Sequence, residues 1–197
     1  MKNKSLLIKL LIAFFFTTNL SAENLEISST EIKLDKKKSQ IVLKGNIKAK
    51  DEYGNILKAE EAFYSKKQDL LNSIGLTTIV TNEDYRFESK NVVFDNRNKI
   101  IKSDFPTKIS DPNGNIFFVT MFNYNSIKNI LFSKGEIELK DINKNIYRFN
   151  QIYIDEKKKK VIGSDAKIFF NDNKMKADIR NNPRIFANSV SIDEGTT

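Results

Sequence analysis

Apolar and polar residues alternate along most of this 197-residue chain with a period of two, as in Ile137-Glu138-Leu139 and Ile152-Tyr153-Ile154. β-branched and aromatic residues dominate the alternating segments, which is typical of strands. No window combines a helical apolar period with capping residues. Turn-forming residues divide the alternation into segments of roughly 8–11 residues, at the upper end of common strand lengths. The pattern predicts an all-β protein.

The alternation itself repeats every thirty residues. A tetrapeptide of apolar, variable, apolar and turn-forming residues recurs at this spacing. Further turn-forming residues recur half a period after each tetrapeptide, at 51–55, 81–85, 111–115, 141–145 and 171–174. An apolar residue follows the first four of these turns, at Leu57, Phe87, Phe117 and Tyr147. Each unit is therefore strand, turn, strand, turn. The tetrapeptides, each apolar, variable, apolar and turn-forming, are Ile32–Asp35, Ala62–Ser65, Val92–Asp95, Phe122–Asn125 and Ile152–Asp155.

Such hairpins cannot bury an apolar face alone, so consecutive units must pair edge to edge. A long sheet that folds over on itself and a closed barrel both satisfy this requirement. The spacing of the turns, with one face apolar throughout, favours two sheets that face each other. We expect an open, twisted β-jellyroll or sandwich of consecutive antiparallel hairpins, built on the thirty-residue repeat.

The apolar face of the repeat forms the candidate interior. The simplest interpretation is that these side chains fill a dry core. A uniform repeat also makes the interior elongated, and a second interpretation is that it binds acyl chains. The candidate ligand-binding residues are Leu34, Ile41, Tyr64, Leu71, Phe94, Ile101, Tyr124, Leu131 and Ile154.

A linear repeat leaves unpaired strand edges at its two ends, which proteins either cover or use for pairing with another chain. Near the C-terminus, Asn182-Pro183 interrupts the repeat, and Val190-Ser191-Ile192-Asp193 restarts it shortly before the last residue, Thr197. This pattern predicts a domain that is incomplete at its C-terminus, or a last strand that pairs outside the chain.

Residues 1–22 have the pattern of a secretory signal peptide. Lys2, Lys4 and Lys9 precede or flank an apolar stretch that is too short to span a bilayer, and small residues ending at Ala22 offer a cleavage site. We therefore expect export, with a single mature domain at 23–197. An uncleaved membrane anchor is the alternative.

Composition narrows the chemistry. The chain has no Cys and no His, which excludes thiol nucleophiles, disulfides, zinc sites of the usual type and imidazole bases. We expect neither catalysis nor a cofactor or metal. Lys and Arg exceed Asp and Glu by 33 − 25 = 8, and removal of the three signal-peptide lysines leaves 30 − 25 = +5. The Lys runs 36–38 and 157–160 fall at turns, where solvated charge is the ordinary expectation, so nucleic-acid binding is not predicted.

Two segments resemble a known family. Gly45-Asn46-Ile47 ends an apolar strand, and Ala59-Glu60-Glu61-Ala62-Phe63-Tyr64 follows the next turn. This style is similar to the OstA-like lipopolysaccharide-transport proteins, and the resemblance covers about 25–193. Two kinds of member fit, a periplasmic bridge protein and the N-terminal periplasmic domain of an outer-membrane lipopolysaccharide-assembly protein. The segment Arg184–Thr197 looks more like the second.

The resemblance implies a non-catalytic module in the periplasm, associated with the outer membrane, whose interior holds the acyl chains of lipopolysaccharide. Its implied partners are neighbouring β-jellyroll proteins, joined by edge-strand pairing, and the outer membrane, reached through a missing C-terminal barrel or another protein. The alternative is an exported structural β-repeat protein that assembles through its strand edges and carries no lipid.

Overall fold

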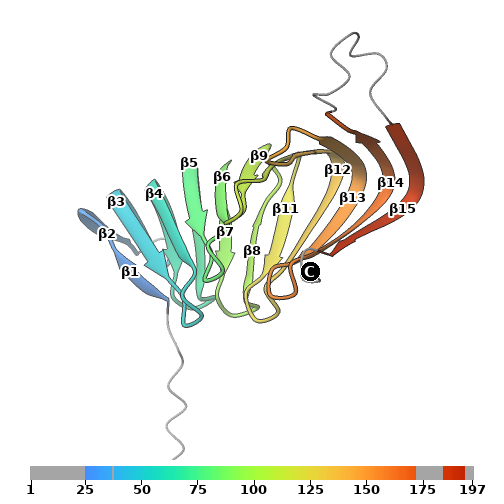
Figure 1. Ribbon diagram of the computed structural model, residues 1–197. Coiled ribbons are helices and arrows are strands. Elements are labelled where there is room, and N and C mark those ends of the chain that lie inside the picture. The colour runs from blue at the N-terminus through green and yellow to red at the C-terminus, as the bar shows by residue number, and fades with distance from the viewer. Residues whose placement is uncertain (1–24, 37, 172–183, 194–197) are drawn as a thin grey trace, which may run out of the picture.

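The computed structural model describes residues 25–36, 38–171 and 184–193, which form one folded, 15-stranded sheet (Figure 1). The predicted signal peptide lies outside the described residues. Every strand pair is antiparallel. The strands are β1 (Glu26–Ser28), β2 (Glu31–Asp35), β3 (Gln40–Lys50), β4 (Ile56–Ser65), β5 (Leu70–Val80), β6 (Arg86–Lys90), β7 (Val93–Asp95), β8 (Ile100–Ser103), β9 (Thr107–Ser110), β10 (Ile116–Val119), β11 (Phe122–Asn125), β12 (Ile130–Lys140), β13 (Ile146–Asp155), β14 (Lys160–Phe169) and β15 (Arg184–Asp193).

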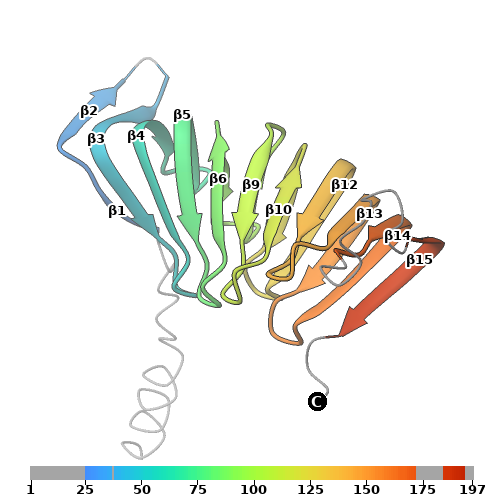
Figure 2. The ribbon, with the colours of Figure 1, turned by 45° about the horizontal axis from the view of Figure 1, so that its top comes forward.

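The sheet folds into two walls because its long strands are interrupted near their middles. The pairing register shifts between Lys44 and Ile47, between Ala59 and Glu61, and between Lys134 and Ile137. Such bulges bend a strand and increase its twist. We call the first wall β2, β7, β8 and β11 with the halves of the long strands that pair with them. The second wall is β1, β6, β9 and β10 with the other halves, and Figure 2 shows it as a continuous surface.

In the middle of the molecule the bent strands are broken instead. The chain leaves β6 for β7, β8 for β9, and β10 for β11 through two or three residues at the corner where the walls meet. The pairing closes a circuit around this region, since β5 pairs with both β6 and β7 and β12 pairs with both β10 and β11. The central part of the fold is therefore enclosed by two walls, while the outer parts are held by continuous bent strands.

Backbone conformation follows the repeat. The last residue of each first-wall turn is left-handed, with φ between 49° and 57° at Ser39, Asp69, Lys99, Asn129 and Lys159. Only one of these residues is Asn and none is Gly, although these are the residues that this conformation favours. Tertiary pairing on both sides of each turn thus imposes the geometry. Second-wall turns repeat a left-handed residue in the same way, at Gly54, Asp84, Gly114 and Lys144.

Asparagines join successive second-wall turns. Within a turn, the Asp111 carboxylate accepts the backbone N–H groups of Asn113 and Asn115 and the Asn115 side-chain amide. Between turns, the Asn115 side-chain oxygen accepts the backbone N–H of Ile142 at 3.3 Å, and equivalent bonds run from Asn82 to Asn55 and from Asn171 to Asn145. These bonds satisfy turn groups that pairing within strands leaves open.

The predicted fold class is confirmed. The described part of the chain is all-β, its hairpins are antiparallel, and the sheet folds over on itself as a β-jellyroll. The restart at Val190–Asp193 is the end of β15, where Val190 pairs with Gly163 and Ile192 with Val161. Among the described residues there is no helix long and apolar enough to cross a membrane.

Candidate apolar interior

The nine candidate residues form one continuous row across the first wall. Each is the direct cross-strand partner of the next, from Leu34 opposite Ile41 to Leu131 opposite Ile154. A step of thirty residues spans two strands, so alternate members of the nine are thirty residues apart in the sequence. The row continues past the predicted set through Val161 to Ile192. We call these eleven residues the first-wall row.

Two of the nine differ from the expected burial. Leu34 lies in the row but is 65% exposed, and Ile41 is half-buried. The reason is that β2 is an edge strand that pairs only with β3, so Leu34 has a neighbour on one side only. The expectation that Leu34 lies inside a filled core is therefore wrong. The other seven are at most 8% exposed.

A second row, absent from the predicted site, faces the first. Its cross-strand partners run along the whole second wall, and it includes the four apolar residues that follow the second-wall turns in sequence. The column formed by these four residues is visible in the sequence, but its position opposite the first-wall row depends on the bends of the long strands. The second-wall row is Ile27, Ala49, Leu57, Ile79, Phe87, Ile109, Phe117, Leu139, Tyr147, Ile168 and Ile185.

The two rows are packed against each other in the middle of the molecule. The ring of Phe87 in the second-wall row lies 6.0 Å from the ring of Tyr124 in the first-wall row, centroid to centroid, and 5.0 Å from Phe122. Phe94 and Ile101 are completely buried. The central interior is thus filled by side chains, as the dry-core interpretation expects.

The interior becomes accessible toward both ends of the sheet. At the N-terminal end, Ile32 is 61% exposed and lies two residues before Leu34 on the same face. At the C-terminal end, Val190 and Ile192 are half-buried and Ile185 is 47% exposed. β1, β2 and β15 each pair with a single strand. The same apolar surface is therefore buried in the centre and uncovered at the edge strands.

The two walls also meet along their turns, opposite the corner. The Lys99 ammonium of a first-wall turn pairs with the Glu52 carboxylate of a second-wall turn. Asn129 donates from its side-chain amide to Asn82 at 2.9 Å and to Glu83 at 3.1 Å. We call this polar junction the seam. It is the boundary at which the walls are held together by side chains rather than by continuous strands.

A buried carboxyl group lies beside the seam. Glu156 is 2% exposed, its Oε2 accepts the Tyr124 hydroxyl at 2.9 Å, and its Oε1 has no hydrogen-bond partner among the described residues. Burial, together with the nearby carboxylates of Glu83 and Asp155, raises the pKa of Glu156 to about 8, although the hydrogen bond from Tyr124 lowers it. Burial also raises the pKa of Tyr124. The Glu156 carboxyl group is thus protonated near neutral pH.

The sequence analysis missed Glu156 because it begins the Lys-rich turn 156–160. Its column in the repeat contains a signal that could have found it. The equivalent residues one and two units earlier, Ser126 and Asn96, are also small or polar, and all three are buried. In the last three units a polar residue at the first turn position is therefore buried, whereas Lys36 and Lys66 at the same position of the first two units are exposed.

Two shallow grooves lie outside the interior, on either side of Pro106 at the corner. Most residues of one groove match residues of the other at a step of sixty, such as Glu88 and Arg148. Their linings include charged side chains of both signs, and they contain fewer apolar than polar side chains. Among the described residues no cluster of carboxylates is arranged to hold a metal ion.

Comparisons with known proteins find a likeness of structure but none of sequence. No family model matches the chain, and no curated protein matches it by sequence. Among solved structures, the chain is similar to LptH of Pseudomonas aeruginosa, described as the LptA-homologous periplasmic component of the conserved lipopolysaccharide transport device. The identity is 10% and the TM-score 0.31, over 83% of this chain and 94% of that one.

Proposed function

We propose that this chain is an exported, non-catalytic carrier module for an acylated amphiphile of the lipopolysaccharide type, of the OstA-like transport family. In this proposal the acyl chains lie against the first-wall row, and edge strands join the module to neighbouring β-jellyroll proteins in the periplasm. In this proposal the module is an LptA-type bridge protein or the N-terminal periplasmic domain of LptD.

The observation that carries the proposal is the unbroken first-wall row. Eleven residues in direct cross-strand contact offer an apolar path along the whole sheet, uncovered at both edges. Burial of acyl chains on such a surface contributes roughly 0.8 kcal/mol per CH₂. An amphiphile can therefore exchange one apolar contact for the next along the row, and no chemical step is required.

One observation favours a second function, an exported structural repeat protein without a lipid ligand. Leu71, Phe94, Ile101, Tyr124 and Leu131 are completely buried by protein side chains. A ligand reaches them only if the walls separate. The two functions therefore differ in a physical event, which is the opening of the seam.

Photo-crosslinking distinguishes the two functions. A crosslinking amino acid at Leu34, which is accessible, and at Tyr124, which is buried, should capture lipopolysaccharide in cells if the chain is a carrier. The same group at Val93, on the opposite face of the strand from Phe94, serves as the matched control. Capture at Val93 as strong as at Tyr124, or no capture at any interior position, would contradict the proposal.

Locking the seam tests how the ligand enters. Because the chain has no Cys, cysteines at Asn82 and Asn129 are the sole thiols and can be joined by a short bismaleimide. We expect the joined protein to lose capture at Tyr124 while it retains capture at Leu34. Cysteines at Lys67 and Arg97, in adjacent turns of the first wall, give a crosslinked control that leaves the seam free.

A further inference from the structure

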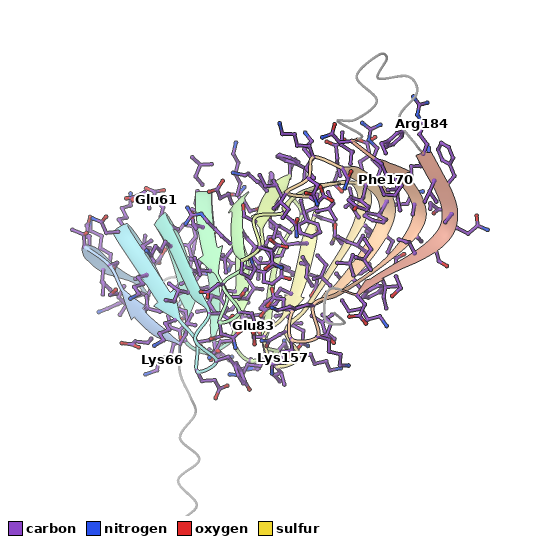
Figure 3. All side chains as sticks on the ribbon, in the orientation of Figure 1. Glu61, Lys66, Glu83, Lys157, Phe170 and Arg184 are labelled. Atoms are coloured by element: carbon purple, nitrogen blue, oxygen red, sulfur yellow. The ribbon has the colours of Figure 1, made fainter. Side chains whose placement is uncertain are left out.

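The turns of the first wall place basic side chains along a single edge of the molecule. Turns at 36–39, 66–69, 96–99, 126–129 and 156–159 each connect two neighbouring strands of that wall. Figure 3 shows Lys66 and Lys157 along the same lower edge, far from Glu61 at the upper edge. We call the exposed cations of these turns the basic ridge: Lys36, Lys38, Lys66, Lys67, Arg97, Lys128, Lys157, Lys158 and Lys159.

The geometry of the ridge is regular. Successive turns are separated by two strands, which corresponds to about 10 Å, so the five turns extend over roughly 40 Å. Every turn contributes at least one exposed cation. In the sequence the Lys runs looked like isolated solvated turns. The fold places them along one edge, because the thirty-residue step returns the chain to the same edge each time.

The acidic residues of these turns are mostly bonded within their own turns, and the Asp155 carboxylate also pairs with the Lys158 ammonium of the ridge at 3.4 Å. The Asp35, Asp95 and Asp155 carboxylates accept backbone N–H groups of their own turns at 3.1, 2.9 and 3.0 Å. Asp69 accepts the Tyr64 hydroxyl, and Glu156 is buried. These acids are half-buried or buried, whereas the ridge cations are exposed. In the part of the chain that the structure describes, the neighbouring second-wall turns hold six acids, which are Asp51, Glu52, Glu83, Asp84, Asp111 and Asp141.

Those neighbouring acids are also partly engaged. Glu52 pairs with Lys99, which is half-buried and therefore not counted among the exposed cations of the ridge, and Glu83 accepts a hydrogen bond from Asn129. Asp84 is exposed. Asp51, Asp111 and Asp141 accept N–H groups of their own turns. The exposed charged side chains of this edge are therefore mostly cations.

We propose that the basic ridge docks on the surface of a bilayer that contains anionic lipids. A row of exposed cations along one edge fits an array of lipid phosphates, and basic residues close to such a surface are attracted within a Debye length of it. The second observation is Ile127, which is 53% exposed at the tip of the central turn 126–129, directly before Lys128. An apolar side chain between cations suits the acyl boundary of a bilayer, whereas a soluble polyanion offers it nothing. The proposal is independent of any ligand in the interior.

Vesicle binding tests the ridge. The probe is a lipid vesicle of phosphatidylcholine with about one third phosphatidylglycerol, against vesicles of phosphatidylcholine alone. The variant K66Q/K67Q/K128Q/K157Q removes four ridge cations. The matched control K48Q/K58Q/K90Q/K102Q removes four exposed lysines from outside the ridge, so that net charge is equal in both. Circular dichroism confirms that each variant folds.

We expect the unmodified chain to sediment with anionic vesicles only, and the binding to weaken as salt rises. Each lysine near the surface changes partitioning roughly fivefold, so the ridge variant should bind at least a hundredfold more weakly. The control variant should bind within about tenfold of the unmodified chain, since only the long-range charge is lost. Equal losses in both variants, or equal binding to neutral vesicles, would overturn the proposal.

Ile127 supplies a separate readout. The chain has no Trp, so I127W adds the sole Trp, whose emission can be excited apart from that of Tyr. We expect its emission to shift to the blue on anionic vesicles and to remain unchanged with heparin, a soluble polyanion. Binding to heparin as tight as to vesicles, with no shift on vesicles, would assign the ridge to polyanionic chains and overturn docking on a bilayer.

Discussion

Ionisation of Glu156 should make the fold less stable as the pH rises. The carboxyl group is buried beside Tyr124, and its pKa in the folded protein is about 8, against 4.5 for the free side chain. The folded state therefore binds this proton more tightly than the unfolded state. The stabilisation is complete below pH 4.5 and is lost as the pH rises through 8.

The magnitude follows from the difference between the two pKa values. At 1.36 kcal/mol for each factor of ten, full ionisation lowers the free energy of unfolding by at most about 5 kcal/mol. E156Q removes this ionisation but keeps the side-chain volume and an oxygen that can accept the Tyr124 hydroxyl. Above about pH 9 we therefore expect E156Q to be more stable than the unmodified chain by several kcal/mol. Near pH 5 the two should agree within about 1 kcal/mol.

Urea denaturation followed by circular dichroism at several pH values measures the effect. The quantity that matters is the difference between the two proteins at each pH, because other titrating groups cancel in it. E136Q, at an exposed carboxylate, is the control and should leave the pH dependence unchanged. If E156Q and the unmodified chain lose stability in parallel between pH 5 and pH 9, the reasoning about Glu156 is refuted.

Three further substitutions test the packing and the turns by the same denaturation measurement. G163A places a Cβ 2.4 Å from the buried Phe149 ring and should cost about 1–3 kcal/mol; an unchanged midpoint would contradict this packing. K159G relieves a left-handed residue and should stabilise by up to about 1 kcal/mol, whereas a loss would mean that the turn does not hold this conformation. N115A removes the side-chain hydrogen bonds to Asp111 and to the next turn and should lower the free energy of unfolding by about 1–3 kcal/mol. An unchanged free energy of unfolding would contradict the stabilising role of these bonds.

The strands and their face assignments were predictable from the sequence because both depend on local patterns. Alternation with a period of two fixes which side chains share a face. The thirty-residue step then fixes which residues share a row. For this reason Tyr64, Phe94 and Tyr124, identified from the repeat alone, lie in one row of the structure.

The bends of the strands were not predictable in the same way. They occur at bulges near Gly45, Gly75 and Gly135, which share a column of the repeat, but the same column holds Phe105 and Asp165. With two of five members unlike Gly, the column does not stand out as a backbone signal. Without the bends, the second-wall row has no assigned partner.

The seam and the exposure of Leu34 depend on contacts that no local pattern encodes. Lys99 pairs with Glu52 across the walls at a sequence separation that the repeat does not mark. Leu34 has the same local pattern as its buried equivalents and differs only in lying on an edge strand. Position in the sheet, rather than residue type, decides its burial.

The repeat makes the length of the molecule a variable that evolution or design can adjust. The strands run in series, and each thirty-residue unit contacts chiefly the units before and after it through cross-strand pairs and asparagine bonds. Deletion or duplication of one unit in phase, such as 56–85, would preserve these junctions and change the span by about 10 Å. The number of thirty-residue units therefore sets the length of the molecule, while its cross-section stays the same.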